Sequence, residues 1–194
     1  MKKGLIIIGI IVVVAIILYS SFKGTYNSMV TKDEAVSTAW AQVENAYQRR
    51  ADLIPNLVNT VKGYATHEQG TLEGVVEARA KATAVNINPS DPQALQQFQQ
   101  SQDQLSSALS RLMVVVEQYP DLKANQNFLD LQAQLEGTEN RISVERNKFN
   151  VAAQDFNTYI RSFPNNIYAS IFKFQPKAYF QAQAGAEKAP EVKF

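Results

Sequence analysis

Few residues in this chain have side chains suited to catalysis or metal binding. The 194 residues include no cysteine and one histidine, His67, which is followed directly by Glu68. Without cysteine, thiol nucleophiles, thiolate zinc sites and disulfides are excluded, and one histidine is too few for a histidine metal cage. Adjacent residues on a helix point in different directions, so His67 and Glu68 do not form a catalytic pair. We therefore expect no metal site and no cofactor.

Carboxylate pairs are the remaining candidates for chemistry. Asp33, Glu68 and Glu145 fall among the apolar positions of expected helices. Two acids in an interhelical cavity can serve as general acid and base, and together with Glu139 they define a hydrolase-like or ligand-sensing alternative. We favour the other interpretation, in which these acids pair with nearby arginines and fix the helix register. We accordingly predict no enzymatic activity.

A second polar group, Arg49, Arg50 and Asp52, stands between two expected helices. Two guanidinium groups can hold an anionic headgroup or the carboxylate of a partner protein. They can equally pair with Asp52 and with carbonyl groups at the helix end, and we favour this second arrangement. All three are candidate interaction residues.

The elements that position these residues start with an apolar segment. No charged residue occurs from residue 4 to residue 22. As a helix this stretch is about 28 Å long, close to the thickness of the hydrocarbon core of a bilayer. We predict a transmembrane helix at residues 4–23 after a short flank, residues 1–3. A cleaved signal peptide is the alternative, but no convincing small-x-small cleavage signal follows. The predicted anchor residues are Leu5, Ile6, Ile7, Ile8, Ile10, Ile11, Val12, Val13, Val14, Ile16, Ile17 and Leu18.

The charges around this segment bear on its orientation. Lys2 and Lys3 before it favour a cytoplasmic N-terminus, whereas Lys23 and Lys32 after it nearly cancel that preference. The small remaining balance favours a body outside the cytoplasm. Residues 24–194 hold 16 basic and 18 acidic residues. Because this body is mildly acidic, it has no basic surface for phosphate backbones, and we expect no binding to nucleic acid.

Helical periodicity continues to residue 164. Apolar residues three or four positions apart predict helices at about residues 26–51, 54–85, 91–119 and 124–163. Asp52 and Pro55 predict a break with a new helix start, and the alternative is one helix kinked at Pro55. The fourth helix carries apolar residues at seven-residue steps, namely Phe128, Leu135, Ile142, Phe149, Phe156 and Phe163.

These helices predict the fold. Four amphipathic helices with short connections pack most simply as an antiparallel bundle, here over residues 24–164. A seven-residue repeat favours side-by-side packing at about 20°. A coiled-coil rod between chains is the alternative, but the loop at residues 86–91 favours folding back. The predicted fold class is all-α, an antiparallel up-and-down four-helix bundle with an N-terminal single transmembrane helix.

The tail divides into two parts. Residues 165–180 are rich in aromatic side chains, which most simply form a cap over one end of the bundle. Contact with the bilayer or with a neighbouring subunit is the alternative. The candidate interaction residues of this part are Tyr168, Phe172, Phe174, Tyr179 and Phe180. Residues 181–194 are mostly Ala, Gln, Glu and Lys, and we predict a disordered tail.

Several motifs together carry a resemblance to a known family. They are Tyr26-Asn27, Ala39-Trp40, Gln48 to Val58, Thr60 to Tyr64, His67-Glu68, Tyr119 to Ala124, Thr138 to Ile142 and Phe163-Pro164. With the N-terminal anchor, they resemble the bacterial LemA family over almost the whole chain. The resemblance implies a four-helix bundle tethered by one N-terminal helix, with no established activity and no agreed catalytic residues. It also implies an N-terminus outside the cell, opposite to the inference from charge.

The sequence thus predicts a non-enzymatic, membrane-anchored module for interaction or scaffolding at the bacterial cell membrane. Self-assembly is one form that such interaction can take, because anchoring in one plane raises the effective concentration of the chains. The expected partners are the lipid bilayer, through the N-terminal helix, and further copies of the chain or other membrane proteins. No nucleic acid and no metal are expected among them.

Overall fold

The computed structural model describes residues 2–65, 67–84 and 87–181, with the backbone alone for residues 2–5 and 18. Across these residues the regular structure consists of six helices, and no strand is present, so the all-α prediction is confirmed. The helices are α1 (Lys2–Lys62), α2 (Gln69–Thr83), α3 (Pro92–Val116), α4 (Pro120–Lys123), α5 (Gln126–Arg161) and α6 (Asn165–Phe172). Of the predicted disordered tail, residues 181–194, Gln181 is described and its carbonyl accepts hydrogen bonds from Gln99 and Arg146, while residues 182–194 lie outside the described residues.

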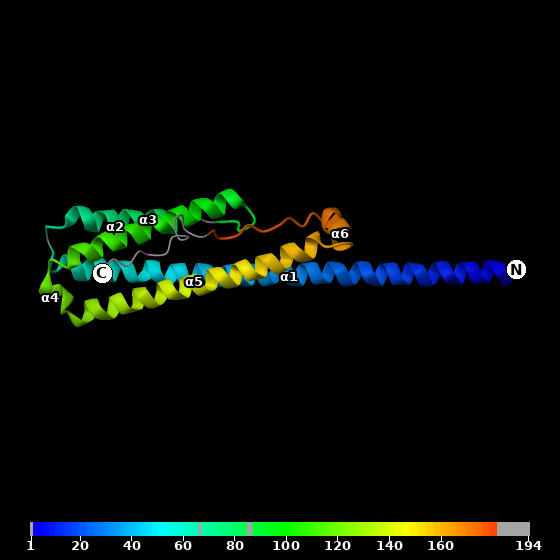
Figure 1. The fold of residues 1–194 in the computed structure, drawn as a ribbon, viewed down its shortest axis with the longest axis horizontal. Helices are drawn as coiled ribbons and strands as arrows, with labels where there is room; N and C mark the ends of the chain where they lie inside the picture. Colours follow the sequence, from blue (N-terminus) through cyan, green and yellow to red (C-terminus); the bar gives the residue numbers. More distant parts are fainter. Residues whose placement is uncertain (1, 66, 85–86, 182–194) are drawn as a thin grey trace, which may run out of the picture.

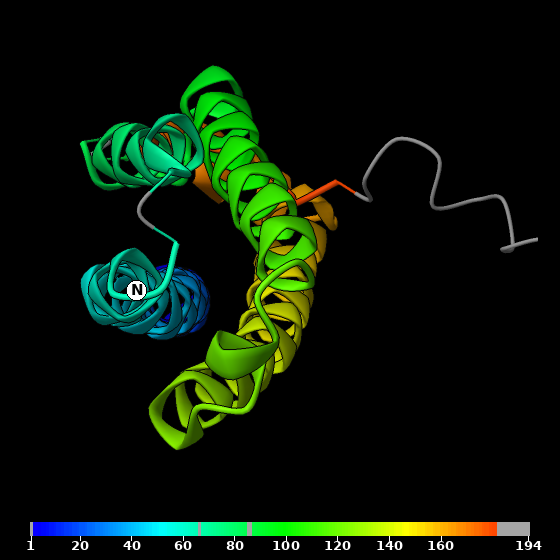
Figure 2. The ribbon, with the colours of Figure 1, turned by 90° about the vertical axis from the view of Figure 1, so that its left-hand side faces the viewer.

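The four longer helices lie side by side and run in alternating directions along the chain (Figure 1). The most extensive pairings are α1 with α5 and α2 with α3, and α2 also packs against α1. In the end-on view, α2 lies above α1 and the pair α3 and α5 lies beside them (Figure 2). The N-terminal part of α1 extends beyond all other helices, while α4 lies at the opposite end (Figure 1). We call residues 24–181 the helical body.

The predicted break at Asp52 and Pro55 is wrong, because α1 continues through both residues to Lys62. Proline has no N–H, so the carbonyl group of Ala51, four residues earlier, loses its helical donor. That carbonyl instead accepts a hydrogen bond of 2.7 Å from Nε of Arg79 on α2. The helix therefore continues because a side chain from a neighbouring helix replaces the missing donor.

The interior of the helical body consists of two hydrophobic clusters that follow one another along the long axis. The proximal cluster, nearer to the apolar N-terminal segment, comprises Met29, Val36, Trp40, Val43, Ala46, Tyr47, Ile87, Leu95, Phe98, Ile142, Phe149, Ala153, Phe156, Ile160, Ala169 and Phe180. The distal cluster comprises Ile54, Leu57, Val61, Ala65, Leu72, Val75, Ala82, Leu105, Ala108, Leu112, Val116, Leu122, Phe128 and Leu135. Three buried polar residues, Arg50, Gln102 and Thr138, occupy the level between them on α1, α3 and α5.

The seven-residue row of the fourth predicted helix is buried except at its last member. Phe128, Leu135, Ile142, Phe149 and Phe156 are all in the core, whereas Phe163 is 83% exposed, so its predicted inward position is wrong. The reason is that α5 ends at Arg161 and Ser162 is already extended. A residue before proline is disfavoured in helical conformation, so the periodicity ceases to apply at Phe163.

Helix termini follow local sequence signals. Asp91 caps α3, since its side chain accepts hydrogen bonds from the backbone N–H groups of Gln93 and Ala94. The side chain of Asn125 accepts from the N–H of Phe128 and caps α5 in the same way. Between α3 and α5, the Tyr119-Pro120 interruption forms the short helix α4. These caps place the starts of the two helices that pack against α2 and α1.

We predict that Arg79→Met lowers the free energy of unfolding by about 1–3 kcal/mol, because it leaves the buried carbonyl of Ala51 without a donor. In a Pro55→Ala background the new N–H supplies that donor, so the same substitution should cost clearly less. Urea unfolding of the full chain in detergent micelles, followed by circular dichroism, measures both differences.

Lys81→Met on the same helix is the matched control. The ion pair of Lys81 with Glu77 is exposed on both sides, so its loss should change stability by no more than about 0.5 kcal/mol. If Arg79→Met lowered the free energy of unfolding equally with Pro55 and with Pro55→Ala, the hydrogen bond from Arg79 would not replace the donor that Ala51 lacks.

Candidate functional site

Arg50 is the centre of a buried polar network and not an exposed interaction residue. Its side chain is 2% exposed and forms an ion pair of 2.8 Å with Glu139 on α5. The guanidinium group also donates to Ser106 and Gln102 on α3, and Gln102 in turn donates to the carbonyl of Ala82. The predicted pairing with Asp52 is therefore wrong for Arg50. Its hydrogen bonds connect α1, α3 and α5, and through Gln102 they reach the end of α2.

Arg49 and Asp52 differ from Arg50 because both are exposed. Asp52 accepts a hydrogen bond of 2.8 Å from Gln48 one turn earlier on α1. Arg49 lines an open groove of about 570 Å³ between α1 and α5, together with Arg141. Only Arg49 and Asp52 of this group are thus accessible to a partner.

The acidic residues considered for catalysis have separate partners. Glu145 is buried and accepts from Arg141 at 2.8 Å and from Lys148 at 3.0 Å, both on its own helix. Asp33 forms an ion pair of 2.6 Å with Lys177. Glu145 and Asp33 thus have separate cationic partners. Arg141 is one of the arginines expected for this role, whereas the partner of Asp33 is a lysine.

Glu68 lies at the distal end, where its carboxylate accepts a hydrogen bond from the hydroxyl of Tyr119. That hydrogen bond, helped by burial, raises the pKa of Tyr119 above 10.0. His67 beside it is exposed. Within residues 2–65, 67–84 and 87–181, no three His, Cys, Asp or Glu side chains are grouped to hold a metal ion.

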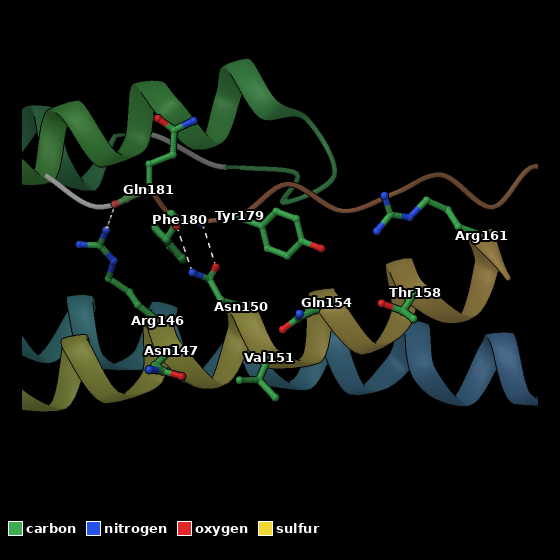
Figure 3. A pocket seen from close by; sticks show the side chains of 10 residues that line it. All are labelled: Arg146, Asn147, Asn150, Val151, Gln154, Thr158, Arg161, Tyr179, Phe180 and Gln181. Carbon is green, nitrogen blue, oxygen red and sulfur yellow. Dashed lines mark hydrogen bonds between the residues drawn. The ribbon is translucent and has the colours of Figure 1, made fainter. Parts of the chain in front are cut away.

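The C-terminal segment, residues 173–181, is held against α5 by two asparagines seven residues apart. Asn150 Oδ1 accepts from the N–H of Phe180 at 2.9 Å, and its Nδ2 donates to the carbonyl of Phe180 at 3.0 Å (Figure 3). Asn157 does the same with Lys177, at 2.7 Å and 2.9 Å. Each side-chain amide thereby pairs with the backbone as a neighbouring strand would, so the segment is fixed without a sheet.

Further contacts hold the same segment from α3 and α5. Gln99 on α3 donates to the carbonyl of Gln181 at 2.9 Å, and Arg146 on α5 donates to it at 3.0 Å (Figure 3). Lys177 donates to Ser90 at 3.1 Å and pairs with Asp33 on α1. The segment therefore contacts three elements that are distant in sequence.

Phe180 completes the proximal cluster. Its ring is stacked on Trp40 at 5.9 Å between centroids and meets Phe149 edge-on at 5.6 Å. The guanidinium group of Arg146 lies 4.7 Å from the centre of the same ring. Because Phe180 is 6% exposed, this candidate interaction residue is a core residue and is not accessible to a partner.

Three of the remaining aromatic candidates, Tyr168, Phe172 and Phe174, contact α1. Tyr168 and Phe172 on α6 contact Phe22 of α1, at 5.6 Å and 5.0 Å between ring centroids. Phe174 contacts Tyr26 and Phe156 at 6.2 Å and 6.1 Å. The predicted cap thus packs on α1 and α5, at the end of the helical body from which the apolar part of α1 extends (Figure 1).

Tyr179 is 40% exposed, and its hydroxyl accepts a hydrogen bond from Asn157. It lines an open cleft of about 700 Å³ beside the C-terminal segment, with Arg146 and Arg161 on the α5 side (Figure 3). Among the residues that line this cleft there is no carboxylate. The cleft therefore presents cations and amides, without an acid for general base catalysis.

None of the described residues outside α1 covers the apolar N-terminal segment. The side chains of Ile6, Ile7, Ile8, Ile10, Ile11, Val12, Val13, Val14, Ile16 and Ile17 are between 49% and 62% exposed. In the described part of the chain, α1 is the one helix that contains a stretch long and apolar enough to cross a membrane. Leu5 and Leu18 lie in the same helix, but their side chains are outside the described residues.

Sequence reasoning missed the two asparagines and Gln102. Asn150 and Asn157 directly follow Phe149 and Phe156, two of the apolar residues at seven-residue steps. Because the same spacing places both asparagines on one side of the helix, it could have predicted a polar row that binds one partner segment. Gln102 lies within a glutamine-rich stretch in which the other glutamines are exposed or half-buried, so nothing in the local sequence distinguished it. Its burial results from its position opposite Arg50.

Comparisons with known proteins agree on one family. A sequence model described as LemA family matches residues 39–194. The chain is similar to Protein LemA of Metamycoplasma hominis, with 26% identity over 166 residues that cover 86% of this chain and 73% of that protein. It is also similar to Magnetosome protein MamQ 1 and MamQ 2 of Paramagnetospirillum magneticum, each with 27% identity over 95% of this chain and 74% of the relative.

We predict that Asn157→Ala releases the C-terminal segment. The substitution removes both hydrogen bonds to the backbone of Lys177, and leaving such part-buried groups unpaired costs about 1–3 kcal/mol. Limited trypsin digestion of the full chain in micelles should then cleave after Lys177 several-fold faster. Asn157→Asp, which keeps the acceptor but loses the donor, should give an intermediate rate.

Asn147→Ala, at an exposed position of the same helix, serves as the control and should leave cleavage at Lys177 unchanged. Equal rates for Asn157→Ala and the unsubstituted chain would show that Asn157 does not hold the segment.

Tyr47 should make stability depend on pH in the alkaline range. Burial is the largest effect and raises the pKa of Tyr47 above 10.0, while the charges of Arg146 and Arg50 partly oppose it. Because the folded chain holds this proton more tightly than the unfolded chain, the contribution to stability is complete below pH 10.0 and is lost as pH rises through the folded pKa. Tyr47→Phe removes the titrating group, so urea midpoints of the variant should fall less steeply above that pH. Parallel declines for both chains would contradict this prediction.

Proposed function

The chain belongs to the LemA family, and from this membership and its architecture we propose that it is a non-enzymatic, single-pass membrane protein whose helical body acts as an interaction or scaffold module. Two of its relatives are named as magnetosome proteins. In this proposal, α1, α2, α3 and α5 form a four-helix bundle, and residues 4–23 cross the bilayer. The partners are the bilayer itself and further copies of the chain or other membrane proteins, without nucleic acid or metal.

The observation that carries this proposal is the continuity of α1. One helix runs from the exposed apolar segment at Ile6–Ile17 to the buried core residues Ile54 and Leu57. A stretch with every face apolar is stable in lipid and not in water. Because the helix does not break at Lys23, the body is joined to the anchor by helical backbone and not by a flexible linker. Such a body stands at a fixed angle to the membrane.

The absence of a convergent set of catalytic groups within the described residues supports a non-enzymatic role. Glu68, Glu139 and Glu145 have different partners, Tyr119, Arg50 and Arg141. The alternative hydrolase-like or ligand-sensing function needs at least two of these carboxylates to face one cavity. None of the contacts described for these three glutamates brings two of them to one cavity, so the scaffold proposal is favoured.

The same geometry supports the proposed self-assembly. A shared anchor gives all copies one orientation, so equivalent faces of two bodies can meet along their length. On the outward side of α5, Val144 and Val151 are 49% and 58% exposed and lie seven residues apart. Since α5 packs along α1, this face would run along the membrane normal in each copy and is accessible to a second copy in the same membrane.

The side of the membrane is part of the proposal. The lysines that flank the apolar segment give a slight preference for a body outside the cytoplasm. The mildly acidic composition of residues 24–194 is compatible with either side. Protease accessibility of the C-terminal tail in intact and opened cells would decide the question.

We predict that crosslinking in native membranes, followed by mass spectrometry, yields links between copies or to other membrane proteins. For self-contact, Val151→Cys should form a disulfide dimer under mild oxidation, because the chain has no other cysteine and a parallel contact brings equivalent residues together. Val114→Cys on α3, 68% exposed, is the matched control and should remain monomeric. Recovery of monomers alone, with no partner, would contradict the scaffold function.

A further inference from the structure

We propose that α6 and Phe163, two residues before it, form a second membrane contact, an apolar face that rests on the lipid surface beside the anchor. This inference extends the proposed membrane anchoring and rests on it. The face consists of Phe163, Ile167 and Ile171, which are 83%, 51% and 60% exposed. Ile167 and Ile171 are one helical turn apart on α6, so both side chains point in the same direction.

The opposite side of α6 fixes it to the anchor helix. Tyr168 and Phe172 pack against Phe22, and the ring of Phe172 lies 4.6 Å from that of Tyr26. Ala169 is buried in the proximal cluster. Because these contacts hold α6 in place, its exposed apolar face has a fixed position on the body.

The position of α6 along α1 selects the bilayer as the occupant. It contacts α1 at Phe22 and Tyr26, at the end of the proposed span, residues 4–23, and just beyond it. At 1.5 Å of rise per residue, Phe22 lies about 8 Å along the helix from Ile17, an exposed residue of the apolar segment. α6 is therefore at the level where the span ends and aromatic rings meet the headgroup region.

The charges around this face suit anionic lipid. Lys23 on α1 and Lys173, directly after α6, are both exposed. The sequence of α6 itself, Asn165–Phe172, contains no acidic residue. An apolar face flanked by lysines is typical of helices that lie at the surface of membranes containing anionic lipid.

The turn after α6 is compatible with this placement. Lys173 has φ of 59°, the left-handed conformation that ends many helices. From there the chain turns back along α5 and is fixed by Asn157 and Asn150. As a result, α6 stays at the end of the body from which the anchor extends. In that direction no other described part of the helical body lies beyond it (Figure 1).

Spin labels at single cysteines test the proposal, because the chain contains no cysteine of its own. The full chain would be reconstituted into vesicles of equimolar phosphatidylcholine and phosphatidylglycerol with a label at Ile171→Cys. Collision rates with oxygen, which partitions into lipid, and with a water-soluble nickel chelate report the environment. We expect the oxygen-to-nickel ratio at Ile171 to be several-fold higher than at Val114→Cys, an exposed position on α3.

A label at Ile11→Cys, within the apolar segment, separates this inference from the proposed anchoring. A lipid-like ratio at Ile11 with a water-like ratio at Ile171 would overturn the α6 contact and leave anchoring intact. Water-like ratios at both positions would overturn both. Dipolar broadening at Ile171 that disappears on dilution with unlabelled chains would identify a second copy as the occupant, which also overturns the proposal.

A second measurement tests the two isoleucines directly. A label at Phe163→Cys should give a lipid-like ratio, and Ile167→Ser with Ile171→Ser in the same chain should shift it towards the value for water. The matched change, Val76→Ser on α2 with Val114→Ser on α3, should leave the label at Phe163 unaffected. Both pairs are about half exposed or more, so neither is expected to unfold the body. An unchanged ratio in the isoleucine variant would contradict the proposed contact.

Discussion

The structure depends on the continuous helical course of α1. This helix is the apolar segment at one end and a wall of both hydrophobic clusters at the other. Every other long element is placed by packing on it or on its neighbour α2. Its continuity survives Pro55 because Arg79 replaces the lost donor at Ala51. A side-chain hydrogen bond from α2 thus satisfies the one carbonyl of α1 that proline leaves without its helical donor.

Between the two clusters, Arg50 acts as a polar divider. A buried guanidinium group is costly unless its donors find acceptors. The two terminal nitrogens of Arg50 find them on Glu139, Ser106 and Gln102, whereas its Nε has no hydrogen-bond partner among the described residues. Sliding α3 or α5 by one turn would separate these partners. The network therefore fixes the register of the helices, whereas the apolar clusters on either side supply the burial.

Much of the fold could be predicted from the sequence, because helices and their buried faces follow from local periodicity. The row from Phe128 to Phe156 and the cap at Asp91 are examples. The predictions of helix boundaries and buried positions failed where tertiary contacts or helix ends overrode the local sequence pattern. Pro55 predicted a break that Arg79 prevents, and the repeat was extended to Phe163 although the helix had already ended. For the candidate site, Arg50 and Phe180 were named as candidate interaction residues, but both are buried and cannot contact a partner.

The sequence by itself determined that the chain is helical, that its first segment is apolar on every face, and which rows of side chains are buried. These properties depend on residues within a few turns of one another. Only the tertiary structure decided which acid pairs with Arg50, that two asparagines hold the C-terminal segment, and that α6 lies beside the anchor. The physical reason is that such contacts join residues far apart in sequence, and their partners are chosen by the relative position of whole helices.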